Sequence, residues 1–208
     1  MKSWVEFFLD LLIVMLAALL IRAYVVIPFK VYGPSMCNTL NSRSGECLMT
    51  YGDRMIVNIF GYLRVGDFEI GAPKSDDIII FAPSAVTQKF YVKRIIAVPG
   101  ETVRIKDGYV YKKQAGEFVQ LEEPYLSEKN IGNTLLPSGP TDTIYTVPED
   151  HYFVMGDNRL QSTDSRNCFH RSSIQPCSAE SLATFVARDQ IKGKAWIRFW
   201  PLNKIELL

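Results

Sequence analysis

The sequence predicts a mostly β body carried by one N-terminal membrane helix. Three observations support this fold class: a long apolar run near the N-terminus, a series of short β-rich runs after it, and a region rich in turn residues from Gln114 to Asp150. The chain has 208 residues, of which 48% are apolar and 22% charged. That length allows one well-packed core with an attached lobe or anchor, but two full domains would be cramped.

The apolar run extends from Trp4 to Val26. As a helix that rises about 1.5 Å per residue, it is long enough to cross the hydrocarbon core of a bilayer, roughly 30 Å. Glu6, Asp10 and Arg22 interrupt the run, but charged side chains near helix ends can reach the membrane surface at modest cost. We therefore predict a membrane anchor over residues 1–27.

A cleaved secretory signal is the alternative interpretation of this segment. Lys2 and the uncharged stretch Leu11–Ile21 both fit the signal template. We favour an anchor because residues 28–34 lead directly into Ser35, which is a candidate nucleophile for the reasons given below. The basic residues on the two flanks are nearly balanced, so they do not predict the orientation.

Turn residues divide the region after the anchor into short β-rich runs. The Asp107-Gly108 pair is typical of a tight hairpin turn, so residues 102–112 are predicted to form one hairpin. The predicted strands are residues 76–81, 90–98, 102–105, 109–112, 151–155 and 194–200.

Two other segments have a different character. Residues 114–150 are rich in Gly, Pro, Glu, Ser and Thr and suit a smaller lobe or extended loops. The spacing of Leu182, Phe185 and Val186 is helical and predicts a short helix within residues 178–190, before the last strand.

Charge and motif content exclude several function classes. The chain has 23 Lys and Arg against 22 Asp and Glu, and a net charge of +1 gives no footprint for a nucleic acid. It contains no GxSxG, SxxK or HExxH motif and no phosphate loop. A Ser-His-Asp triad built on His151 or His170 is possible but has no supporting pattern.

The four cysteines fall into two close pairs without CxxC spacing or neighbouring histidines, so we predict no metal site. In an oxidising compartment disulfides would form instead. We favour a bond between Cys168 and Cys177; one between Cys37 and Cys47 is possible.

Lys93 and Ser35 are the remaining candidates for catalysis. A neutral lysine can activate a serine, provided that burial lowers its pKa from about 10.4 toward the working pH. Strand alternation places Lys93 on one face with the apolar side chains of Tyr91, Ile95 and Ala97. The alternative is a lysine at a strand edge with its ammonium in water. Ser35 follows Gly-Pro in a turn, which is by itself weak evidence because many loop serines do so.

A dense polar segment, residues 156–166, follows the predicted strand 151–155. A solvated turn is the ordinary explanation of such a segment. The functional explanation is a hydrogen-bonded shell that positions a lysine and the loop carrying the nucleophile.

These segments, in this order, resemble the sequence boxes of bacterial type I signal peptidases over nearly the whole chain. The resemblance implies an all-β catalytic body with a smaller inserted β lobe and one N-terminal transmembrane helix. The matching segments after the anchor are SMCNTL (35–40), DDIIIF (76–81), YVKRIIAVPGE (91–101), GDNRLQSTDSR (156–166) and IKGKAWIRFWP (191–201).

By this resemblance the chain is a serine endopeptidase that removes signal peptides from exported preproteins without a metal or cofactor. Ser35 would be the nucleophile and Lys93 the general base, with Ser162 hydrogen-bonded to the lysine amine. The Ser35 N–H would form part of the oxyanion hole. The expected supporting residues are Ser162, Asp164, Arg166, Asp157, Asn158 and Arg94. The expected substrate contacts are Tyr32, Met36, Tyr91 and Val92, with Met36 lining a pocket.

The resemblance also implies a domain division and a location. Residues 28–101 with 151–208 would form the catalytic core, and residues 102–150 the inserted lobe. The chain would cross the cytoplasmic membrane once, contact lipid, and hold its body on the extracytoplasmic side near the secretion translocon.

Several departures from the family pattern keep alternatives open. Asn38 replaces the family proline of the nucleophile box, and Gly33 stands where one branch has a serine hydroxyl. Glu101 is a mild change, and insertions follow the nucleophile box at residues 41–47 and the polar box near residues 167–181. The alternatives are an inactive relative that only binds preproteins, or a specialised one that processes a single exported protein.

Overall fold

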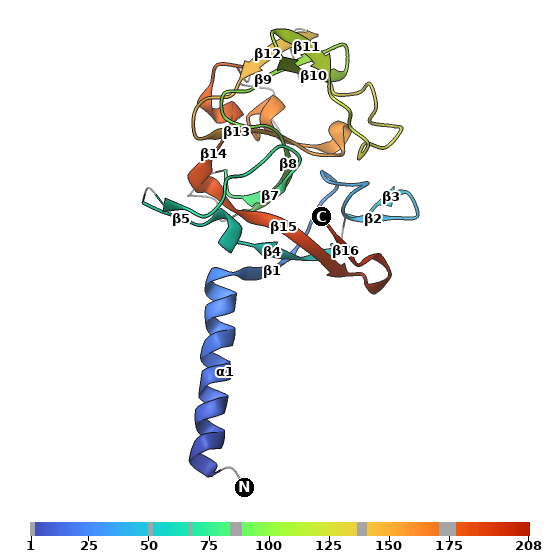
Figure 1. The fold of residues 1–208 in the computed structure, drawn as a ribbon. Helices are drawn as coiled ribbons and strands as arrows, with labels where there is room; N and C mark the ends of the chain where they lie inside the picture. The colour runs from blue at the N-terminus through green and yellow to red at the C-terminus, as the bar shows by residue number, and fades with distance from the viewer. Residues whose placement is uncertain (1–2, 50–51, 67, 84–88, 137–140, 171–177) are drawn as a thin grey trace.

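The computed structural model describes residues 3–49, 52–66, 68–83, 89–136, 141–170 and 178–208. It consists of one long N-terminal helix and a β body, which confirms the predicted fold class (Figure 1). The helix, α1, runs over Trp4–Tyr24 and has no buried residue. Its first turn is closed by Ser3 and Glu6, each of which accepts a hydrogen bond from the backbone N–H of the other.

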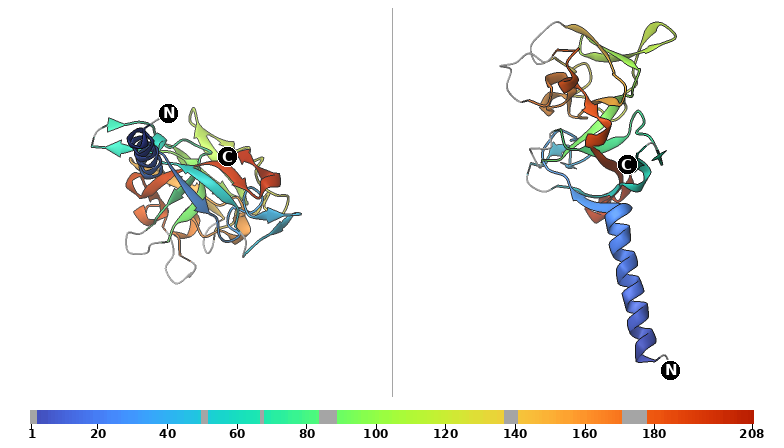
Figure 2. Two further views of the ribbon diagram at one scale, coloured as in Figure 1. Left: turned by 90° about the horizontal axis from the view of Figure 1, so that it is seen from below. Right: turned by 90° about the vertical axis from the view of Figure 1, so that its left-hand side faces the viewer.

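Helix α1 projects from the body as a separate rod (Figures 1 and 2). Its mean hydropathy reaches 2.4, and by length and composition it is the one helix of the described residues able to cross a membrane. An apolar surface that no part of the body covers needs an apolar environment. The predicted anchor therefore coincides with α1.

The body is built on one eight-stranded antiparallel sheet in the order β1-β4-β15-β7-β8-β13-β14, with β16 paired to β15. Strands far apart in the chain are therefore neighbours, and the last long strand lies between two early ones. The sheet contains β1 (Val26–Lys30), β4 (Arg54–Asn58), β7 (Ile78–Phe81), β8 (Tyr91–Ala97), β13 (His151–Met155), β14 (Val186–Ala187), β15 (Ile191–Trp200) and β16 (Glu206–Leu207).

A second, four-stranded sheet in the order β11-β10-β9-β12 lies at the end of the body opposite α1 (Figures 1 and 2). The predicted hairpin is present: β9 and β10 are joined by Asp107 and Gly108, both with positive φ (51° and 83°). A Cβ on Gly108 would lie 2.0 Å from Gly132 O, so no larger residue fits there. The strands are β9 (Thr102–Lys106), β10 (Tyr109–Gln114), β11 (Glu117–Gln120) and β12 (Asp142–Thr146).

The two sheets share a hydrophobic core. Val103 and Ile105 of the small sheet pack in one cluster with Ile96 of β8 and Phe153 of β13. The division into a catalytic core and an inserted lobe of residues 102–150 stays a proposal, since this cluster joins both.

Short elements complete the described residues. Two further hairpins are β2 (Ser42–Arg43) with β3 (Glu46–Cys47), and β5 (Arg64–Val65) with β6 (Phe68–Glu69). The short helical turns, all 3₁₀, are η1 (Phe60–Tyr62), η2 (Arg159–Gln161), η3 (Ser165–Asn167), η4 (Leu182–Thr184), η5 (Arg188–Gln190) and η6 (Leu202–Lys204).

The predicted helix at residues 178–190 is wrong. The segment forms the single turn η4, the strand β14 and the turn η5. Val186 pairs with Tyr152 at the edge of β13, so the backbone is satisfied by the sheet. Phe185 and Val186 are both buried, but in different hydrophobic clusters. A helix would turn neighbouring side chains through only about 100°, whereas a strand sends them to opposite faces.

Candidate active site

Ser35 and Lys93 are 58 residues apart in the chain, yet Lys93 Nζ donates a hydrogen bond of 2.7 Å to Ser35 Oγ. Ser35 lies in the turn after β1, where Gly33 adopts a positive φ of 86°. Lys93 lies within β8, and its Nζ also donates to Val92 O at 3.0 Å. A hydroxyl in contact with an amine is the arrangement that an amine base needs to activate an alcohol nucleophile.

The Lys93 side chain is buried, with only 2% of the residue exposed. The alternative of an ammonium in water is therefore wrong. Burial lowers the pKa of Lys93 from 10.5 to about 8; the negative charges of Asp164 and Asp157 oppose this shift, and the positive charge of Arg166 adds to it. Among the described residues no carboxylate forms an ion pair with Lys93, which leaves desolvation dominant.

The predicted alternation of β8 holds around Lys93 and fails after it. Tyr91 and Ile95 pack in one hydrophobic cluster, and Val92 packs in another. The pairing with β13 then shifts register, so that Ile96 and Ala97 both enter the cluster beneath the small sheet. Because of this bulge, β8 contributes Lys93 to the candidate site and also contributes side chains to the core beneath the second sheet.

Arg94 points to the other side of β8 and is paired with a carboxylate. Its Nε and Nη2 donate to the Asp157 carboxylate at 2.9 and 2.7 Å. Burial opposes the charged form, but the hydrogen bond and charge of Asp157 outweigh it and raise the pKa of Arg94. Asp157 also accepts a hydrogen bond of 2.5 Å from Thr39 Oγ1 of the nucleophile loop. The Arg94–Asp157 ion pair therefore connects β8 to that loop.

A second buried ion pair lies in the polar segment. Arg166 Nε and Nη2 donate to the two oxygens of Asp164 at 2.9 and 3.0 Å. Burial would raise the pKa of Asp164, but the charge and hydrogen bonds of Arg166 outweigh it and lower that pKa. Asp164 also accepts from Gly156 N at 3.1 Å, which fixes the start of the segment.

Asn158 connects the polar segment directly to the nucleophile. Its backbone N–H donates a hydrogen bond of 3.0 Å to the carbonyl oxygen of Ser35, and its Nδ2 donates one of 3.1 Å to the carbonyl oxygen of Pro34. The backbone N–H of Ser35 donates no hydrogen bond to any group in the part of the chain that the structure describes. A free N–H beside the nucleophile oxygen is suited to bind a developing oxyanion.

A cleft of about 540 Å³ opens beside Ser35 and Lys93. Three of the four predicted substrate contacts, Tyr32, Tyr91 and Val92, line it. The fourth, Met36, does not line this cleft: it is only 1% exposed and packs in the core beneath the nucleophile loop. Other lining residues are Phe29, Lys30, Val31, Gly33, Pro34, Lys89, Phe90, Gln161, Thr163, Phe169 and His170.

The family described as "signal peptidase, peptidase S26" matches residues 3–200 of this chain. The chain belongs to the signal peptidase family. Signal peptidase I T of Bacillus subtilis is 35% identical over 98% of this chain and 89% of its own length. Signal peptidase IB of Staphylococcus aureus is 28% identical over 99% of this chain and 94% of its own. A solved signal peptidase I from Enterococcus faecalis is 31% identical with a TM-score of 0.41, over 59% of this chain and 96% of that one.

The predicted hydrogen bond from Ser162 to the Lys93 amine is not formed in this signal peptidase family member. Ser162 Oγ is buried and makes no hydrogen bond of standard geometry with the described residues, although the hydroxyl helps to lower the pKa of Asp164. A Cβ on Gly156 would lie 2.3 Å from Ser162 Oγ and 2.3 Å from Ser35 O. Only glycine at position 156 therefore allows this hydroxyl to lie so close to the nucleophile turn.

Asn38, which replaces the family proline, has a φ of 99°. Proline is fixed near −65°, so the nucleophile loop of this signal peptidase cannot accept proline at position 38 without changing its path. Asn38 Nδ2 donates 2.7 Å to Tyr125 O, a contact that proline cannot make. The departure from the family pattern is thus part of a different loop conformation that has its own contacts.

The inserted residues 41–47 of this family member form the β2–β3 hairpin, closed by a disulfide between Cys37 and Cys47. This is the pair that the sequence left as possible. The favoured pair, Cys168 with Cys177, lies partly outside the described residues because Cys177 is not among them. The observed disulfide begins two residues after Ser35 and therefore restrains the nucleophile turn.

Sequence reasoning missed three buried residues that brace this turn. The Asp53 carboxylate accepts hydrogen bonds from the Asn41 backbone N–H at 2.9 Å and from Arg198 Nη1 at 3.1 Å. Asn41 Nδ2 in turn donates a hydrogen bond of 3.1 Å to the carbonyl oxygen of Gly33, two residues before the nucleophile. No local pattern marks these residues. Asn41 and Asp53 are 12 residues apart, and Arg198 reaches them only because β15 lies beside β4 in the sheet.

Proposed function

We propose that Ser35 and Lys93 are the nucleophile and general base of this signal peptidase, and that its substrates are the signal peptides of exported preproteins. The observation that carries the proposal is the 2.7 Å contact between Ser35 Oγ and Lys93 Nζ. It occurs where burial lowers the pKa of the lysine to about 8, so a useful fraction of the amine is neutral near physiological pH.

The reaction follows from these positions. Neutral Lys93 accepts the proton of Ser35 Oγ as that oxygen attacks the scissile carbonyl carbon. The carbonyl oxygen gains negative charge and is stabilised by the Ser35 N–H, an interaction of a kind that contributes roughly 3 kcal/mol. Lys93 then gives its proton to the leaving amine as the C–N bond breaks. Water, deprotonated by Lys93, hydrolyses the acyl-enzyme and restores Ser35.

The supporting residues would act by position. Asn158 holds the carbonyl groups of Pro34 and Ser35, which fixes the direction of the free Ser35 N–H. Arg94 with Asp157, and Arg166 with Asp164, keep their charges paired, so neither carboxylate forms an ion pair with the buried lysine. Ser162 stays a proposed partner of the lysine amine in the reacting complex, since its hydroxyl is buried close to the nucleophile turn.

The substrate would lie as an extended strand in the cleft lined by Tyr32, Tyr91 and Val92. Small side chains at positions −1 and −3 relative to the cleaved bond would enter shallow apolar pockets there. The core position of Met36 makes it a support of the cleft floor rather than a lining residue.

Helix α1 would span the cytoplasmic membrane and contact lipid, with the β body on the extracytoplasmic side and near the translocon. The Cys37–Cys47 disulfide supports an oxidising compartment for the body. Strand β1 starts two residues after α1, which would keep the cleft close to the membrane surface where a signal peptide ends.

The test compares the purified chain with Ser35→Ala and Lys93→Ala variants in liposomes, using a preprotein with an Ala-x-Ala cleavage site. We expect cleavage by the parent and none by either variant, with unchanged circular dichroism. A parent that binds the preprotein without cutting it would instead support the inactive binding relative. A parent that cuts one exported protein and no other would support the specialised relative.

A further inference from the structure

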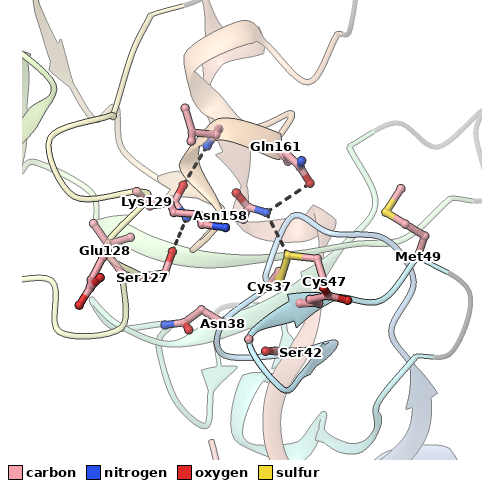
Figure 3. A pocket seen from close by; sticks show the side chains of 15 residues that line it. Cys37, Asn38, Ser42, Cys47, Met49, Ser127, Glu128, Lys129, Asn158 and Gln161 are labelled. Carbon is pink, nitrogen blue, oxygen red and sulfur yellow. Dashed lines mark hydrogen bonds between the residues drawn. A yellow bond between two sulfur atoms is a disulfide. The ribbon is translucent and has the colours of Figure 1, made fainter.

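A second cleft of about 790 Å³ is lined by Cys37 and Asn38 of the nucleophile loop (Figure 3). One wall is the β2–β3 hairpin with its disulfide, and the facing wall is the segment 126–130 that follows the small sheet's first three strands. Residues 158–161 of the polar segment lie between the walls. The reaction described above uses none of the hairpin or the facing segment.

The second cleft continues the first. Gln161 lines both of them. A hollow of about 390 Å³ joins them and is lined by Pro34, Met49, Leu160, Gln161, Ser162 and Thr163. Ser35, which follows Pro34, lies at the junction. One path therefore runs from Phe29 and Lys30, past the nucleophile, to the hairpin.

The direction of this path is set by the anchor. Phe29 and Lys30 belong to β1, which directly follows α1, whereas the second cleft lies between the hairpin and segment 126–130, farther from the helix (Figure 1). The apolar part of a signal peptide precedes the cleaved bond and belongs in the membrane. The chain that follows the cleaved bond therefore has to leave on the side of the second cleft.

We propose that the second cleft binds the first residues of the mature protein, those immediately after the cleaved bond, as an extended peptide. The proposal rests on the proposed function and adds a specificity site to it. Met49 and Leu160, 62% and 54% exposed, offer apolar contacts in the hollow that Pro34 also lines. The farther walls also carry the polar side chains of Ser42, Glu46, Ser127, Glu128 and Lys129.

Both walls are fixed in place, as a binding site requires. The hairpin is held by the Cys37–Cys47 disulfide and by Asn158 Nδ2, which lies 3.6 Å from Cys47 Sγ (Figure 3). In the facing segment, buried Asn130 donates 2.8 Å to Ser127 Oγ and accepts 3.1 Å from Leu160 N. The cleft is therefore a preformed feature that binding does not have to assemble.

The test uses two peptide substrates with the same signal side and cleavage site. One ends two residues after the cleaved bond and the other eight residues after it. We expect the parent in detergent to cleave the longer peptide with a kcat/KM about tenfold higher than that of the shorter one. A tenfold difference corresponds to about 1.4 kcal/mol of additional binding energy in the second cleft. Glu46→Trp and Glu128→Trp, one on each wall, should fill the cleft and remove this preference.

The short peptide distinguishes an effect on binding in the second cleft from an effect on the catalytic residues. Its kcat/KM should be unchanged in both tryptophan variants, and Glu117→Trp on exposed strand β11 should keep the tenfold preference as the matched control. Equal cleavage of the two peptides by the parent would overturn the proposal, as would variants that slow both peptides alike. A parent that cleaves neither peptide would overturn the proposed function, and this proposal with it.

Discussion

The two faces of strand β8 shift the pKa values of two neighbouring cationic side chains in opposite directions. Lys93 and Arg94 are both buried, at 2% and 8% exposure, and adjacent in sequence. Lys93 faces Ser35 without a carboxylate partner, and burial lowers its pKa to about 8. Arg94 faces Asp157 in a two-point ion pair, and its pKa is raised.

The difference shows that burial alone does not decide the charge state of a cation. Desolvation disfavours the charged form on both faces, and only the paired carboxylate reverses its effect. A general base needs the first environment, because it must lose its proton near the working pH. A structural cation needs the second. Each prediction below changes one of these two environments or the loop between them.

The largest effect is expected for Lys93→Met, which removes the amine but keeps a long apolar side chain. Cleavage should fall roughly 10⁴-fold or more, because Lys93 is the only basic side chain among the described residues that hydrogen-bonds to Ser35 Oγ. The same variant should be more stable than the parent at pH 7, because a buried lysine with a lowered pKa destabilises the fold while it is protonated. A variant that cleaves within tenfold of the parent would contradict the role of Lys93.

The size and pH range of that stability gain follow from the pKa. A shift from 10.5 to about 8 corresponds to about 3 kcal/mol below pH 8. Above pH 8 the native lysine loses its proton while the unfolded one keeps it, so the parent gains stability and the difference vanishes by about pH 10.5. Denaturant unfolding of both proteins in detergent at pH 7 and pH 10 measures this convergence.

On the other face, Asp157→Asn leaves the Arg94 guanidinium buried without a carboxylate. The free energy of unfolding should fall by about 3–5 kcal/mol, as for other broken buried pairs. Asp142→Asn is the matched control: its partner Arg104 forms the same two-point contact on the small sheet, but with 28% of its side chain exposed. We expect a much smaller loss there, because solvent screens an exposed ion pair. Equal losses at the two sites would contradict the importance of burial.

The disulfide that restrains the nucleophile loop is tested by replacing Cys37 and Cys47 together with serine. It closes a loop of sequence separation 10, so its removal should cost about 3 kcal/mol of stability. Because the loop carries Ser35, kcat should fall more than KM rises. Steady-state kinetics on a preprotein measures the split, and a change confined to KM would place the effect of the disulfide on substrate binding.

The pH dependence of cleavage reports on Lys93 directly. Below its pKa the amine is protonated and cannot accept the Ser35 proton, so kcat/KM should rise about tenfold per pH unit up to about pH 8 and then level off. Arg94 should add no second step, because its pKa is raised. A flat profile between pH 6 and pH 9 would exclude Lys93 as the titrating base.

Much of this fold was predictable because local patterns agreed with it. The apolar run gave α1, the Asp107-Gly108 turn gave the β9–β10 hairpin, and β-rich runs gave the long strands of the main sheet. The segment 178–190 failed because its apolar spacing suits a helix, while the unpaired edge of β13 offered hydrogen bonds that favoured β14. Local spacing cannot report a sheet edge that the rest of the chain creates.

The candidate site divides in the same way. Ser35, Lys93 and the polar segment could be named from residue types in order along the chain. Three features could not be predicted: the missing hydrogen bond between Ser162 and Lys93, the core position of Met36 and the positive φ of Asn38. Each depends on how the nucleophile loop packs against other segments.

The family, the membrane-length helix and the residues available for chemistry can be recognised in the amino-acid sequence, since these are properties of local composition and order. The desolvation of Lys93, the pairing of Arg94, and the meeting of Asn41, Asp53 and Arg198 behind the nucleophile turn become visible only in the folded chain. Burial and charge pairing depend on what distant segments place around a side chain. Strand order in the sheet sets those neighbours, and no stretch of the sequence contains that order.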